Sequence, residues 1–256
     1  MITDVNVYLS RWPFRRLPYD ETPALVEKLR QSDITQAWAG SFDGLLHKDV
    51  AQVNSRLVDE CKKHGDGLLR PVGTVNPTLP DWQDDLRRCH DEYKMQAIRL
   101  HPNYHGYTLD DPRFAELLTL AEAAGLIVQL ALYMEDPRTH HKLLPIQHVQ
   151  PGPLKELMSA RPQLKMILLN TGTSIAGAPL AELVRAGNVY IDTSHAESIV
   201  GLEKLVRLVP PERILFGSHF PFFILEANLF KFQESELGTT VTEAIQSQNA
   251  QMLIGE

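Results

Sequence analysis

The sequence has 256 residues, of which 43% are hydrophobic and 22% are charged, and its formal net charge is −7. This composition is typical of a globular protein with a large core. The lysines and arginines are scattered and form no basic stripe, which argues against nucleic acid as the main partner. The apolar runs are shorter than the roughly 18 residues that a membrane-spanning helix requires.

The amino-terminal segment MITDVNVYL predicts a strand. It lacks the basic region and the long apolar run of a signal peptide, so we do not expect it to be one. Cys61 and Cys89 lie too far apart for a zinc-binding CxxC pair. No segment rich in proline, glycine or serine divides the chain. We therefore expect a single domain over residues 1–256 in a cytoplasmic protein.

Short apolar segments alternate with helical segments along the whole chain. Strands are predicted at residues 3–9, 34–41, 68–75, 96–101, 126–132, 165–170, 189–192 and 214–217. Helices are predicted at about 22–32, 49–63, 113–124, 152–160, 178–186, 197–209, 225–236 and 240–253, with a further helix starting at Asp81. Strict alternation of strand and helix indicates a parallel sheet. Eight such units in ~250 residues predict an α/β fold of the (β/α)8 TIM-barrel type.

In such a barrel the carboxyl ends of the strands converge, so that polar residues far apart in sequence meet above the core. The polar residues at or just beyond predicted strand ends are Asn6, Tyr8, Arg99, His101, Glu135, Arg138, His140, His141, Asn170 and His219. His195 follows the seventh strand, where we expect it to cap the next helix. This collection predicts a functional pocket at the carboxyl ends of the strands.

Several segments, in order, resemble the amidohydrolase-related family of TIM barrels, of the amidohydrolase 2 type. The segment ILFGSHFPF resembles the family's eighth-strand signature, in which an aspartate takes the place of His219. The other matching segments are AIRLHPNYHGY, AEAAGLIVQLAL, RPQLKMILLNTGT, NVYIDTS and QNAQMLIG. The resemblance implies a metal-dependent-hydrolase-like barrel over nearly the whole chain.

The resemblance also implies a set of metal ligands that this sequence has lost. Asn6 and Tyr8 stand where the family has an HxH pair, and Ala131 and Asn170 replace histidines of the fifth and sixth strands. Asparagine and tyrosine are poor zinc ligands, and alanine is none. We therefore expect no cofactor and no metal-activated water.

The first hypothesis is a metal-independent hydrolase of a small carboxylated lactone, ester or amide. His219 acts as the general base, because imidazole titrates near neutral pH. Arg99 and Arg138 bind the anionic group of the substrate. The residues expected to donate hydrogen bonds to the oxyanion are His101, Asn170 and Tyr8, and those expected to complete the substrate site are Asn6, Glu135, His140 and His141.

Two alternatives remain open. A rebuilt zinc site uses His101, His140 or His141, Glu135 or Asp136, and His219. A catalytically degenerate barrel instead binds a ligand or a partner. The expected partner is a small-molecule substrate. The long loops after strands one, four and five predict either a lid or a contact within a homo-oligomer.

Overall fold

The computed structural model describes residues 1–172, 174–198 and 200–255, and strands and helices alternate through them as the sequence predicts. Residue 199, which belongs to a predicted helix, lies outside the described residues. The strands are β1 (Ile2–Leu9), β2 (Ile34–Ser41), β3 (Leu69–Pro71), β4 (Gly73–Thr74), β5 (Ala97–Leu100), β6 (Ile127–Ala131), β7 (Lys165–Leu169), β8 (Asn188–Asp192) and β9 (Ile214–Leu215).

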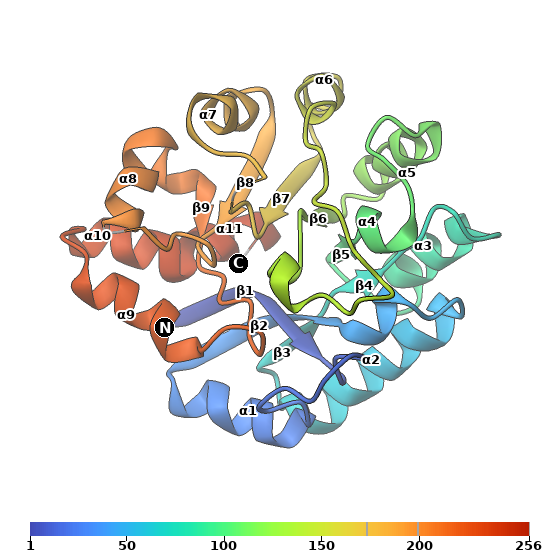
Figure 1. Ribbon diagram of the computed structural model, residues 1–256, viewed down its shortest axis with the longest axis horizontal. Helices are drawn as coiled ribbons and strands as arrows, with labels where there is room; N and C mark the ends of the chain where they lie inside the picture. Colours follow the sequence, from blue (N-terminus) through green and yellow to red (C-terminus); the bar gives the residue numbers. More distant parts are fainter. Residues whose placement is uncertain (173, 199, 256) are drawn as a thin grey trace.

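The helices form an outer ring around the strands (Figure 1), except for α11, which packs against the barrel interior. They are α1 (Thr22–Gln31), α2 (Val50–Gly65), α3 (Trp82–Asp91), α4 (Pro102–His105), α5 (Pro112–Ala123), α6 (Leu154–Ser159), α7 (Gly177–Arg185), α8 (Gly201–Leu208), α9 (Leu225–Glu234), α10 (Thr239–Glu243) and α11 (Asn249–Ile254). The helix predicted over 240–253 contains a π-helical turn, Ala244–Gln248, between α10 and α11. No helix of the described ranges combines the length and the apolarity needed to cross a membrane.

The strands close into the predicted barrel. They pair in parallel in chain order, with one break between β3 and β4, because Val72 interrupts the strand predicted over 68–75. The Val72 amide still donates to Ala39 O at 2.9 Å, which keeps the broken strand against β2. On the other side, Val5 N–H donates to Phe216 O and Tyr8 N–H donates to Phe220 O, each at 3.0 Å. These bonds join the first strand to the last.

Two apolar layers support the barrel. The larger layer lies between the strands and the surrounding helices, where strands such as β6 and β7 are rich in apolar residues and have both faces buried. The smaller layer fills the amino-terminal half of the interior, where Ala250 and Leu253 of α11 pack against Val5, Ile127 and other residues of the strands. With that end plugged, polar side chains gather at the carboxyl ends.

Two long segments cover the carboxyl ends. The segment after β5 contains α4, a helical turn in a region that the sequence predicted as loop. The segment between β6 and α6 contains a 3-10 turn, η2 (Pro137–Thr139), and passes across the mouth of the barrel (Figure 1). The candidate site lies beneath this second segment.

Candidate functional site

A buried hydrogen-bonded network forms the floor of the barrel mouth. Asn6 Nδ2 donates to Asn170 Oδ1 at 2.8 Å and to Asp192 Oδ2 at 2.7 Å. Asp192 Oδ1 accepts the amide N–H of Asn170 at 3.0 Å. A Cβ atom on Gly217 would lie 2.7 Å from Asp192 Oδ2, so only glycine lets the end of the last strand approach this carboxyl. The network holds the ends of β1, β7 and β8 together.

Burial raises the pKa of Asp192 from 3.8 to about 6, against the lowering effect of its hydrogen bonds, of which the one from Asn6 is the largest. The folded protein therefore keeps the Asp192 proton at pH values where the unfolded chain releases it. The stabilisation that follows is complete below pH 3.8 and is lost as the pH rises through about 6. Its full size is about 3 kcal/mol.

We expect Asp192→Asn to remove this pH dependence. The free energy of unfolding of the variant, minus that of the wild type, should grow more positive between pH 4.5 and pH 7.5 in denaturant titrations. Using this difference cancels the other carboxyls, including Asp4, whose pKa burial also raises. The exposed Asp110→Asn is the control, and its difference should be constant. A constant difference for Asp192→Asn would contradict the assignment.

His219 lies at the centre of the mouth and is 0% exposed. Its Nε2 atom is 2.6 Å from Met134 O, and because a carbonyl oxygen can only accept, Nε2 carries the proton. Nδ1 then has a lone pair with no partner among the described residues. Burial lowers the pKa of His219 to about 4, so the ring is neutral at pH 7. A buried neutral imidazole with one free nitrogen is equipped to accept a proton.

The backbone beside His219 is held by Asp4 of β1, which binds the preceding residue, Ser218. Asp4 Oδ1 accepts the amide N–H of Ser218 at 3.0 Å, and Asp4 Oδ2 accepts the Ser218 hydroxyl. His219 itself adopts φ +57°, in the left-handed region that few residues other than glycine and asparagine occupy readily. Such backbone conformations persist where the surroundings impose them, and they concentrate at functional sites.

His101 and Tyr8 form a second buried pair at the mouth. His101 Nε2 is 3.0 Å from the Tyr8 hydroxyl, and His101 Nδ1 has no partner among the described residues. Burial, and then the neighbouring His105, lower the pKa of His101, so this ring is also neutral. The Tyr8 ring lies between the two imidazoles, with its centroid 5.9 Å from that of His101 and 5.9 Å from that of His219.

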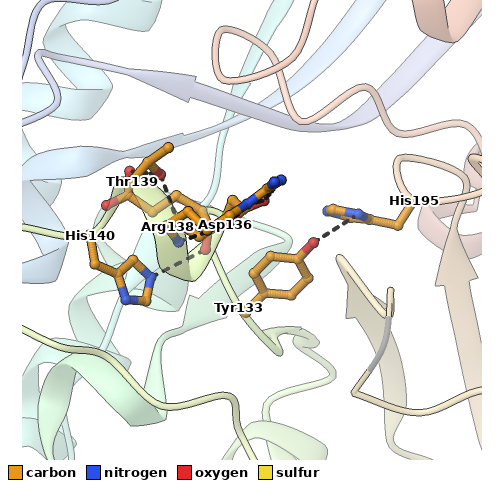
Figure 2. A network of polar contacts seen from close by, with 7 residues as sticks. Tyr133, Asp136, Arg138, Thr139, His140 and His195 are labelled. Carbon is orange, nitrogen blue, oxygen red and sulfur yellow. Dashed lines mark hydrogen bonds and ion pairs between the residues drawn. The ribbon is translucent and has the colours of Figure 1, made fainter.

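A third histidine belongs to the site, although the sequence predicted only a capping role for it. His195 Nδ1 is 3.0 Å from the Tyr133 hydroxyl (Figure 2), and its Nε2 is buried without a partner among the described residues. Burial lowers the pKa of His195 to about 3, and its ring centroid is 6.2 Å from that of His219. The capping prediction is wrong, because α8 begins only at Gly201.

Arg99 does not bind an anion at the mouth, so that prediction is wrong. Its guanidinium is fully buried and donates to Val7 O at 2.9 Å, and to Val5 O and Trp38 O at 3.1 Å. Nε donates to Gln129 Oε1 at 2.7 Å. Arg99 thus ties the inner sides of four strands together, one layer below the tips.

Arg138 does not reach the centre either. Its side chain is 89% exposed and forms an ion pair with Asp136, two residues away (Figure 2). His140 Nε2 lies 3.2 Å from Glu135 O, and His140 Nδ1 accepts the amide of Ile146. The predicted substrate contacts of Arg138 and His140 are therefore replaced by contacts within the covering segment.

Glu135 and His141 attach this segment to the segment after β1. Glu135 is buried and accepts a hydrogen bond from Arg15 Nη1 at 2.5 Å. The exposed His141 stacks on Phe14, with 5.6 Å between the ring centroids. Both residues act at the cover of the mouth, and neither contacts His219.

This fold and this site define a (β/α)8 barrel with buried histidines at the carboxyl ends of its strands. The family model for amidohydrolases matches residues 10–255, and the chain belongs to that family. The sequence-based resemblance is thereby confirmed. A comparison with curated proteins found no match.

Solved structures with the same fold share little sequence with this chain. The 2,6-dihydroxybenzoate decarboxylase from Rhizobium is 14% identical, with a TM-score of 0.77 over 99% of this chain and 98% of that one. The 5-carboxyvanillate decarboxylase from Sphingomonas paucimobilis is 12% identical, with a TM-score of 0.79 over 99% and 98%. A dihydroxybenzoic acid decarboxylase from Polaromonas, with bound manganese, is 14% identical, with a TM-score of 0.75 over 99% and 96%. At this identity the likeness concerns the fold.

The described residues show no assembled site for a metal ion. No group of three or more His, Cys, Asp or Glu side chains converges in a metal-binding arrangement within the described ranges. At the positions that resemble the family's ligands, Ala131 offers no donor atom, whereas Asn6 Oδ1 is buried without a partner among the described residues. Of the residues predicted for a rebuilt zinc site, His140 has both nitrogens hydrogen-bonded within its own segment, whereas His101 Nδ1 and His219 Nδ1 have no partner among the described residues.

Proposed function

We propose that the chain hydrolyses a small carboxylated ester, lactone or amide without a metal ion, at the centre formed by His101, His195 and His219. One observation carries the proposal: four buried polar atoms at strand ends lack partners among the described residues. They are Asn6 Oδ1, His101 Nδ1, His195 Nε2 and His219 Nδ1. Buried polar atoms are nearly always hydrogen-bonded, so a substrate and a water molecule are their natural partners.

In the proposed reaction, His219 Nδ1 takes a proton from water as the water oxygen attacks the carbonyl carbon of the substrate. The Met134 carbonyl, which accepts from Nε2, stabilises the imidazolium that forms. In this reaction the Tyr8 hydroxyl donates its one hydrogen to His101 Nε2, 3.0 Å away, and not to the Met134 sulfur at 3.4 Å, so His101 Nδ1 carries the proton and donates to the developing oxyanion. The leaving oxygen or nitrogen then receives the proton from His219, which restores the neutral ring.

A second candidate is decarboxylation of a carboxylated aromatic compound. It is supported by the decarboxylases among the structures of the same fold and by the aromatic rings around the mouth. Tyr8 stacks on Phe42 with centroids 4.8 Å apart, and Phe222 stacks on His219 at 5.0 Å. Release of CO2 distinguishes this reaction from hydrolysis, which releases an acid with an alcohol or an amine. If substrates of neither class are turned over, the result favours a barrel that only binds a ligand.

We expect turnover to survive removal of divalent metal. Untagged protein should be screened against esters, lactones and carboxylated aromatic acids before and after treatment with a chelator, with its metal content measured by elemental analysis. The rate should change by less than about twofold, because the proton acceptor is an imidazole and not a metal-bound water. Loss of the activity with the chelator, and its return on adding manganese or zinc, would overturn the metal-free mechanism.

A further inference from the structure

A groove outside the barrel mouth ends at His195, one of the three histidines of the site. It has a volume of about 420 Å³, and its lining includes Tyr133, Asp192 and His195 at one end. One wall is apolar, formed by side chains on and near α7 and α8, namely Ile175, Leu180, Leu205 and Leu208. His219, by contrast, is fully buried under the segment after β6. The groove is therefore the open surface that exposes the His195 end of the centre.

The polar end of the groove is closely built. Tyr133 and His195 lie against the backbone of Gly172, where a Cβ atom would be 2.9 Å from Tyr133 Cε1 and 3.5 Å from His195 Nδ1. Gly172 has φ +43°, a conformation that also favours glycine. His148 stacks on the other face of Tyr133, with centroids 4.6 Å apart. The pair is thus held from both sides, while the buried His195 Nε2 has no partner among the described residues.

The charges of the groove select a type of ligand. Lys204 is the one cationic side chain in its described lining, is exposed, and has no ion pair with the described residues. Arg99 and Arg138, which the sequence assigned to a substrate carboxylate, are occupied elsewhere. The exposed Glu197 also lines the groove and disfavours a second negative charge.

We propose that this groove binds an amphipathic monocarboxylate. Its carboxylate meets Lys204, its apolar body lies on Leu205 and Leu208, and its other end reaches Tyr133 and His195. This inference deepens the proposed function, since it assigns the substrate's carboxylate and apolar body to named residues. The binding itself requires no reaction and can be measured separately.

The test is a titration of the full chain, labelled on its leucine and isoleucine methyl groups, with hexanoate and with hexan-1-ol, followed by NMR. Hexanoate should shift the methyl signals of Ile175, Leu180, Leu205 and Leu208 in a saturable manner. Lys204→Gln should weaken hexanoate binding about fivefold, the size of an exposed ion pair, and leave hexanol binding unchanged. Lys62→Gln, on the exposed face of α2, is the matched control and should change neither.

Equal hexanoate affinities of Lys204→Gln and Lys62→Gln, or methyl shifts outside the groove, would overturn the proposal. Failure of the proposed function has a different result: hexanoate binds as described, but no ester, lactone or amide turns over. His219→Gln should bind hexanoate like the wild type, because His219 is not part of the groove lining. Once a carboxylated substrate is found, an unchanged KM for Lys204→Gln would also count against the groove.

Discussion

His219→Gln is expected to lower kcat by about 10²- to 10⁴-fold, the usual contribution of a positioned general base. The glutamine amide can still donate to Met134 O, as His219 Nε2 does. It has no nitrogen that can take up a proton in place of Nδ1. The loss should therefore fall on kcat, with the fold retained. Steady-state kinetics on the substrate found by the screen, with the melting temperature of each variant, measure it.

The pH profile provides an independent readout for His219. Its pKa is lowered to about 4 by burial, and the neutral form is the active one. Wild-type kcat/KM should therefore be maintained above this value and fall as the pH drops through about 4. Asparagine tolerates the left-handed backbone conformation of residue 219, so His219→Asn separates the loss of the imidazole from the effect of backbone strain. The exposed His90→Gln is the matched control and should behave like the wild type. A normal kcat in His219→Gln would remove His219 from the mechanism.

Alternation along the sequence was sufficient to predict the barrel, because each strand is short, apolar and followed by a helix. The predicted strand over 34–41 agrees with β2, and the ends of the others differ by a few residues. The break at Val72 separates Leu69–Pro71 from Gly73–Thr74 within one predicted strand, although Pro71 and Gly73 on either side of it are residues that weaken strand interiors. Their separation depends on pairing with β2, which is a tertiary effect.

The depth of a side chain along the barrel axis was harder to predict than its strand. Arg99 and His101 point to the same side of β5 by the period of two, and the sequence treated them as one functional group. In the structure His101 reaches the mouth, while Arg99 lies below it, with its Cζ 4.4 Å from the centroid of the Tyr8 ring. Two residues along the chain separate a candidate catalytic group from a structural one.

Loop residues were the least predictable part of the site. Arg138 forms an ion pair with its near neighbour Asp136, whereas Glu135 is hydrogen-bonded to Arg15, which is 120 positions away in the chain. Local turn geometry decides between such partners, and composition does not reveal it. His195 was missed as a site residue because its place in the site depends on a hydrogen bond with Tyr133, which comes from a different loop. Its position directly after the seventh strand was the available signal.

Arg99→Met is expected to lower the free energy of unfolding by about 3–5 kcal/mol, because it leaves buried acceptors on several strands without their donor. Methionine fills a similar volume but cannot donate to Val5 O or to Val7 O. Denaturant titrations measure the loss, and the exposed Arg138→Met is the matched control, with an expected change within about 0.5 kcal/mol. Arg99→Lys should recover only part of the loss, since one ammonium group cannot match the planar fork that contacts three backbone carbonyls. If Arg99→Met instead unfolded like the wild type and raised KM for a carboxylated substrate, the original prediction that Arg99 binds the anionic group of the substrate would be supported.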